Sequence, residues 1–186
     1  MTPLNNILQW NMQAYRTKFS ELKCLLHKYT PVCACLQETL IRAGTAPKPP
    51  SHYNIETSLQ ARNDGHERGT AIVIHKSVTY KRIPLQTSIQ AVAVTLCLNR
   101  KYTVCGIYLP HIPVRLAELE GLLHQLPRPV IILGDMNALS PMWGDPHTRV
   151  NNRGELFEQI LNRHPLSLLN DGSPTHYHIQ SGTLSA

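Results

Sequence analysis

Three short apolar segments that each end in amide or acidic residues constrain this chain more than any other feature. The segments are 6–10, 32–38 and 129–133, and the polar residues at their ends are Asn11, Glu38 and Asp135. Continuous apolar runs of this length are typical of strands buried on both faces. Because strand ends are held rigidly, polar groups at several of them can converge on one rim of a sheet.

The remaining pattern alternates helices with strands. Apolar residues recur at helical spacing over 16–29, 114–126 and 154–163, and further strands are predicted at 70–75, 89–98 and 102–109. The tight connection at 99–101 predicts an antiparallel hairpin, and the prolines within 43–51 predict a loop. Mixed strands with few helices favour an α/β fold in which two mixed β-sheets pack face to face, with helices outside.

Length and composition limit the classes of protein to which this chain can belong. A length of 186 residues predicts one domain, and no apolar run approaches the ~20 residues that a membrane span needs. No secretory signal opens the chain, and the five cysteines form no C-x-x-C, which favours buried free thiols in an intracellular, reducing compartment. The net charge of +6 is compatible with nucleic acid as partner, although a merely basic surface explains it equally well.

The polar strand ends suit one kind of chemistry. Two carboxylates with amides, and no cysteine cluster, favour a hard cation such as Mg²⁺. Mg²⁺ polarises a phosphoryl oxygen, a second carboxylate can deprotonate water, and amides can donate to phosphate. Each residue alone has a plainer interpretation: Glu38 as a solvated strand end, Asp135 as a turn or N-cap residue, Asn11 and Asn137 as turn residues, and Tyr108 as core. Their joint arrangement favours a site.

The order of these motifs resembles a known superfamily. Trp10-Asn11, Leu36-Gln37-Glu38-Thr39, Tyr108-Leu109-Pro110 and Gly134-Asp135-Met136-Asn137 follow the order of the exonuclease–endonuclease–phosphatase superfamily, which includes the apurinic/apyrimidinic endonucleases. Nearer the C-terminus come Asn137-Ala138, Ser140-Pro141, Trp143-Gly144, Asn152-Arg153-Gly154, Pro174-Thr175-His176 and Gly182-Thr183-Leu184-Ser185-Ala186. These resemble the endonuclease domain of non-LTR retrotransposons of the Jockey and R1 type, over nearly the whole chain.

The resemblance implies a four-layered α/β sandwich spanning 1–186 as one domain, with divalent-metal phosphodiester hydrolysis by Mg²⁺ or Mn²⁺. Such domains nick one DNA strand and leave a 3′-hydroxyl that primes a reverse transcriptase in the same polyprotein, in the nucleus when the target is chromosomal. The implied roles are metal binding by Glu38 and Gln13, metal and phosphate contact by Asn11, scissile-phosphate contact by Tyr108, water activation by Asp135, and assistance by Asn137.

Three departures from the family pattern qualify these expectations. Gln13 stands where many relatives have Asp or Asn, and Leu139 stands where retrotransposon relatives usually have His. The sequence also ends before the family's Ile-Asp and Ser-Asp-His segment, which supplies part of its site. We therefore expect a domain lacking its last strands, C-terminally incomplete, that nicks plasmid DNA feebly or not at all.

Further contacts and other functions stay open at this point. Arg68, His111, His147, Arg149 and Arg153 lie in predicted loops near the motifs, where they can touch DNA phosphates or be solvated surface residues. The same core could instead serve a metal-dependent phosphoesterase acting on a small or lipid phosphate, or a nucleic-acid-binding module without catalysis. The nuclease interpretation requires the carboxylates of Glu38 and Asp135 to face one cleft, about 5–10 Å apart.

Overall fold

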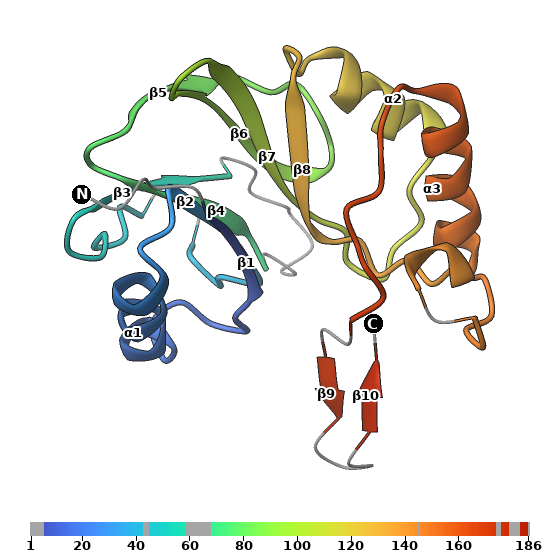
Figure 1. Ribbon diagram of the computed structural model, residues 1–186, viewed down its shortest axis with the longest axis horizontal. Coiled ribbons are helices and arrows are strands. Elements are labelled where there is room, and N and C mark those ends of the chain that lie inside the picture. The colour runs from blue at the N-terminus through green and yellow to red at the C-terminus, as the bar shows by residue number, and fades with distance from the viewer. Residues whose placement is uncertain are drawn as a thin grey trace.

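A computed structural model describes residues 6–42, 45–58, 68–144, 146–173, 176–178 and 183–185. Two four-stranded sheets lie face to face, with helix α1 outside one sheet and helices α2 and α3 outside the other (Figure 1). The predicted α/β sandwich of two mixed sheets with outer helices is confirmed.

The first sheet is built mostly from the N-terminal part of the chain. Its strands are β1 (Ile7–Asn11), β2 (Cys33–Gln37), β4 (Thr70–His75) and β3 (Tyr53–Thr57), in that spatial order. β1 and β2 are parallel, whereas β4 is antiparallel to both of its neighbours. Helix α1 (Phe19–Tyr29) connects the parallel pair, as a parallel crossover requires. It ends at Thr30, whose φ of 40° is left-handed, immediately before Pro31.

The second sheet has the spatial order β5 (Thr79–Ile83), β6 (Gln90–Cys97), β7 (Lys101–Tyr108) and β8 (Val130–Asp135). The predicted antiparallel hairpin is β6–β7, and β8 joins β7 in parallel after α2 (Leu116–His124). A 3₁₀ turn (Pro141–Trp143) and α3 (Asn152–Arg163) follow β8. Two short antiparallel strands, β9 (His176–His178) and β10 (Thr183–Ser185), project from the body of the molecule (Figure 1).

The apolar strands are covered on both faces, which explains their continuous hydrophobicity. Cys33 and Cys35 of β2 face the second sheet and pack in one cluster with residues such as Val104. Ala34 and Leu36, the alternate residues of the same strand, pack against α1. A third apolar layer lies between the second sheet and helices α2 and α3, and its buried members include Ile107, Leu119, Leu122 and Ile160.

Sequence patterning missed β3 and β5. Apart from the buried Tyr53, the positions of these two edge strands are half-buried or exposed, so neither strand carries the apolar run that marks β2 or β4. Helix α3 begins at Asn152, two residues before the predicted start. In the described part of the chain, no helix is long and apolar enough to cross a bilayer.

The cysteine prediction holds only in part. All five thiols are free, and Cys33, Cys35 and Cys105 are buried. Cys24 and Cys97 are exposed, which corrects the expectation of five buried thiols. Cys97 is the last residue of β6, where the chain turns away from the core, and Cys24 lies on the solvent side of α1.

Candidate active site

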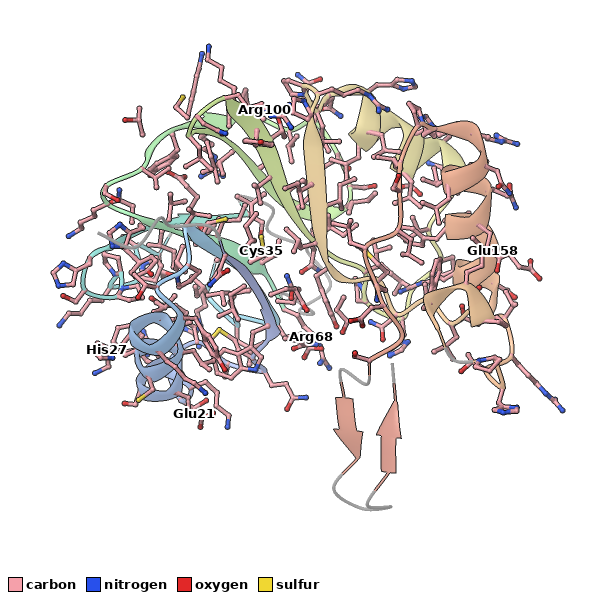
Figure 2. The ribbon with its side chains drawn as sticks, in the orientation of Figure 1. Glu21, His27, Cys35, Arg68, Arg100 and Glu158 are labelled. Atoms are coloured by element: carbon pink, nitrogen blue, oxygen red, sulfur yellow. The ribbon has the colours of Figure 1, made fainter. Side chains whose placement is uncertain are left out.

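The ends of β1, β2, β7 and β8 meet at one rim of the sandwich. Asn11 ends β1, Glu38 follows β2, Tyr108 ends β7 and Asp135 ends β8. Tyr108 and Asp135 are direct neighbours in the parallel register of β7 and β8. Figure 2 labels Arg68 at this rim, and Arg100, in the β6–β7 turn, at the opposite end of the molecule.

Asn11 joins the two carboxylates of the rim. Its Nδ2 donates to Glu38 Oε1 at 3.0 Å and to Asp135 Oδ2 at 2.8 Å. The two acceptor oxygens therefore lie within about 6 Å of each other, a spacing that can share one metal-bound phosphate. The structure thus brings together Asn11, Glu38 and Asp135 from three distant parts of the sequence.

Glu38 has two further partners. Tyr108 donates its hydroxyl to Glu38 Oε1 at 3.1 Å, and Arg68 Nη1 lies 2.6 Å from Glu38 Oε2. Burial alone raises the pKa of the Glu38 carboxyl, but the hydrogen bonds from Asn11, Arg68 and Tyr108 outweigh burial and lower this pKa. Burial, reinforced by the charge of Glu38, raises the pKa of Tyr108 to about 12. At neutral pH the rim therefore holds an ionised glutamate and a protonated tyrosine.

Asp135 is held in place by the segment that follows it. Its Oδ1 accepts a hydrogen bond from the backbone N–H of Asn137 at 3.0 Å. The side chain of Asn137 donates to the Leu109 carbonyl at 2.9 Å, so it secures the loop after β7. Gly134 allows β8 to approach β7 closely here, because a Cβ at this position would lie 1.9 Å from the Ile107 carbonyl oxygen.

Three of the predicted site residues share an uncommon backbone conformation. Gln13, Glu38 and Asn137 have φ values of 54°, 50° and 49°, and each follows a strand of the rim. Left-handed conformations are unfavourable by about 1–2 kcal/mol for residues with a Cβ, and they cluster at functional sites. The tertiary structure therefore imposes these turns where the strands leave the sheets.

A hard cation fits the donor set of this rim. The buried Oδ1 of Asn11 has no hydrogen-bond partner, and Glu38 is ionised. Mg²⁺ is commonly held by one or two carboxylates together with water and substrate phosphate. The described residues contain no group of three or more His, Cys, Asp or Glu side chains able to hold a metal, so a richer ligand set is not found among them. Gln13 is exposed and no hydrogen bond ties it to the rest of the rim in the described residues.

The predicted DNA-contacting residues divide into two groups. Arg68 lies at the rim, where it forms an ion pair with Glu38, and three further residues are exposed on loops: His111, His147 and Arg149. Arg153 differs from these four residues, because its guanidinium is half-buried and donates to four backbone carbonyls. The sequence predicts a loop at Arg153, whereas the residue lies in the first turn of α3.

Two residues near the rim were missed from the sequence. Asn151 caps α3 through its side-chain oxygen and donates its Nδ2 to the Asn137 carbonyl at 3.2 Å. An asparagine directly before a helix is a recognisable N-cap signal. Gln90 is 3% exposed and accepts a hydrogen bond from Gly69 N at 2.8 Å, next to Arg68. No local pattern indicates Gln90, because its partner lies 21 positions away.

Comparison with known proteins agrees with this geometry. Residues 102–185 match a family described as endonuclease-reverse transcriptase. A probable RNA-directed DNA polymerase from transposon X-element of Drosophila melanogaster is 28% identical over 184 residues, which cover 95% of this chain. The endonuclease domain of TRAS1, a telomere-specific non-LTR retrotransposon, aligns with a TM-score of 0.76 and 22% identity over 96% of this chain and 80% of that domain. The predicted resemblance to the non-LTR retrotransposon endonucleases is confirmed.

More distant solved structures share the same fold. An AP endonuclease of Leishmania major aligns with a TM-score of 0.60 and 13% identity, over 84% of this chain and 66% of that one. An AP endonuclease of Archaeoglobus fulgidus aligns with a TM-score of 0.57 and 17% identity, over 84% of this chain and 70% of that one. At this level of identity the two structures share the fold. The chain spans about a fifth of the length of its transposon relative.

Proposed function

We propose that residues 1–186 form the DNA endonuclease domain of a non-LTR retrotransposon and hydrolyse a phosphodiester with the help of a divalent cation. The observation that carries the proposal is the Asn11 amide, which joins the Glu38 and Asp135 carboxylates at the ends of strands from two sheets. Similarity to the X-element polymerase over 95% of this chain supports the same conclusion.

The cation would be held on the Glu38 side of the rim. Glu38 supplies an ionised carboxylate, and Asn11 supplies a buried amide oxygen that has no other partner. Gln13 leaves β1 nearby and would add an amide oxygen. Bound Mg²⁺ or Mn²⁺ would supply a Lewis acid that polarises a phosphoryl oxygen and stabilises the leaving oxygen.

Asp135 and Tyr108 would act on the water and the phosphate. Asp135 accepts a proton from the water whose oxygen forms the new bond to phosphorus, while the bond from phosphorus to O3′ breaks and O3′ takes up a proton. Asn137 assists by holding Asp135 Oδ1 through its backbone N–H. Tyr108, protonated because its pKa is raised to about 12, donates to a phosphate oxygen whose charge grows during the reaction.

DNA is the proposed substrate because the chain is basic and an arginine lies at the rim. The chain carries a net charge of +6, and Arg68 lies half-exposed at the rim itself. His111, His147 and Arg149 are exposed on loops that follow β7 and β8. A polyanion that reaches these loops would gain affinity by releasing counterions.

The 3′-hydroxyl product of the proposed cleavage indicates a partner for this domain. Cleavage that leaves a 3′-hydroxyl creates a primer end for DNA synthesis. The X-element relative is described as an RNA-directed DNA polymerase and is about five times as long as this chain. We propose that the domain acts beside a reverse transcriptase in one polyprotein, and in the nucleus when the target is chromosomal.

Nicking of supercoiled plasmid under single-turnover conditions, with enzyme in excess, tests the proposal. We expect slow conversion to the open circle with Mg²⁺, none with EDTA, and none with Asp135→Asn, whereas Arg100→Gln at the far end of the molecule retains the wild-type rate. A DNA polymerase should extend the nick directly, because its end is a 3′-hydroxyl.

Other outcomes would indicate a different function for this protein. Hydrolysis of inositol or lipid phosphates without DNA nicking would identify a phosphoesterase. Salt-dependent DNA binding that survives Glu38→Gln and Asp135→Asn, with no Mg²⁺-dependent nicking at any enzyme concentration, would identify a binding module and overturn the endonuclease proposal.

A further inference from the structure

The N-terminus of α3 is attached directly to the segment that follows Asp135. Asn151 donates to the Asn137 carbonyl at 3.2 Å and accepts from the backbone N–H of Leu139 at 3.0 Å. Gly154 permits this contact, because a Cβ at that position would lie 1.9 Å from the Leu139 carbonyl oxygen. The helix therefore begins in backbone contact with one of the loops that form the rim.

Arg153 extends this attachment to the other loop. Its Nη1 donates to the carbonyls of Leu109 at 2.6 Å and Met136 at 3.1 Å. Its Nη2 donates to the carbonyls of Pro110 and, at 2.6 Å, Ile112. Three of these carbonyls belong to the loop after β7 and one to the loop after β8, so a single guanidinium bridges both loops.

This environment is unlike that of a surface arginine. The side chain is half-buried, and among the described residues no carboxylate pairs with it. Burial lowers the pKa of the Arg153 guanidinium. A partly buried charge is tolerated where its donors are satisfied, and the planar fork of arginine can serve four carbonyls in a way that a lysine ammonium cannot.

The two bridged loops carry catalytic groups of the proposed reaction. Leu109 follows Tyr108, and Met136 lies between Asp135 and Asn137. Leu109 N donates to the Asp135 carbonyl at 3.0 Å, and Asn137 shares the Leu109 carbonyl with Arg153. We propose that Arg153 is a positioning residue, which fixes the Tyr108 hydroxyl relative to the Asp135 carboxylate without touching DNA. This inference rests on the proposed endonuclease function.

Single-turnover kinetics can distinguish a positioning role of Arg153 from a direct contact with DNA. For Arg153→Lys and Arg153→Met, we expect single-turnover nicking at saturating DNA to slow by about 10- to 100-fold, since misplaced catalytic groups lose rate steeply. DNA affinity and its salt dependence should stay within about twofold of wild type. Arg163→Met is the matched control, because Arg163 lies on the same helix and pairs with Glu120 at 3.2 Å. A weakened affinity with a smaller salt slope and an unchanged saturating rate would overturn the inference.

Chemical rescue tests the same inference more directly. Guanidinium at millimolar concentration, below denaturing levels, should restore part of the rate of Arg153→Ala and leave Arg163→Ala unchanged. A residue that acts only on global stability would not respond, because the added ion cannot replace a lost helix contact. Rescue that is equal for both variants, or that is matched by sodium ions, contradicts the positioning role.

Amide hydrogen exchange provides a measurement that needs no catalysis. The N–H groups of Leu109 and Asn137 donate to Asp135, and that of Leu139 donates to Asn151 at the start of α3. We expect their exchange to accelerate at least tenfold in Arg153→Met and to remain unchanged in Arg163→Met. Unchanged exchange in Arg153→Met would overturn the inference, whereas absence of nicking by the wild-type chain would count against the proposed function and leave this result intact.

Discussion

The Arg68 guanidinium lies 2.6 Å from Glu38 Oε2, on the carboxylate proposed to hold the cation. The backbone around Arg68 is also attached to this strand end, since Leu40 N donates to the Arg68 carbonyl at 2.9 Å. The hydrogen bond to Glu38 raises the pKa of Arg68, so its charge persists at any working pH. Arg68 and a divalent cation bound at Glu38 would therefore compete for one carboxylate.

Removing this competitor should tighten metal binding. In Arg68→Gln we expect the affinity for Mn²⁺, measured by electron paramagnetic resonance of the free ion without DNA, to rise by about two- to fivefold, the range of a half-exposed ion pair. DNA affinity should fall at the same time, because a positive charge at the rim is lost. Arg100→Gln is the control, since Arg100 donates to the Tyr102 hydroxyl at the other end of the molecule. Weaker Mn²⁺ binding in Arg68→Gln would show that Arg68 supports the cation.

Much of the rim could be predicted because its signals are local. β2 is buried on both faces, and the half-buried β8 packs apolar side chains toward both of its faces, so each produces an apolar run, and the polar residue at its end is conspicuous. β3 and β5 lack this signal because polar residues interrupt their apolar ones, and most of their positions are half-buried or exposed. Their identity as strands depends on pairing with β4 and β6, which a local pattern does not contain.

Contacts between distant residues could not be predicted in the same way. The bond between Asn11 and Asp135 spans 124 positions and depends on how the two sheets stack. The environment of Arg153 could not be predicted for a related reason: charge and a position near a loop suggest a phosphate contact, whereas in the fold four backbone carbonyls converge on its half-buried guanidinium. Only the folded chain shows those carbonyls together.

The amide of Asn11 should stabilise the fold when no metal is bound at the rim. Asn11→Asp replaces a donor shared by two carboxylates with a third carboxylate, so we expect the free energy of unfolding in EDTA to fall by about 1–3 kcal/mol. Mg²⁺ should recover more stability in the variant than in the wild type, because the added charge favours the cation. Thermal unfolding with EDTA and with Mg²⁺ measures both effects. Asn99→Asp, in the exposed β6–β7 turn, controls for the added charge. Equal Mg²⁺ stabilisation of variant and wild type would argue against a cation at Asn11.

Tyr108 should act as a neutral donor across the working pH range. In Tyr108→Phe we expect saturating nicking to slow on the order of 100-fold, as for loss of one donor to a developing charge. The shape of the pH–rate profile between about pH 6 and 9 should not change, because burial raises the pKa of Tyr108 to about 12. Tyr102→Phe, which removes only a surface contact with Arg100, should retain the wild-type rate. A descending alkaline limb that disappears in Tyr108→Phe would show instead that the phenol titrates within this range.

The lowered pKa of Glu38 makes the stability of the metal-free rim depend on pH. Because the folded-state pKa lies below the unfolded value of about 4.3, ionised Glu38 stabilises the fold above that value, and the stabilisation is lost as pH falls through the folded-state pKa. In EDTA we expect the wild type to be more stable than Glu38→Gln near pH 6, and the difference in the free energy of unfolding to shrink below about pH 4. Glu21→Gln, on the exposed side of α1 beside Lys18, gives the background for removing one carboxylate. If the difference instead widens on acidification, burial outweighs the hydrogen bonds from Asn11, Arg68 and Tyr108, and Glu38 favours its protonated form in the fold.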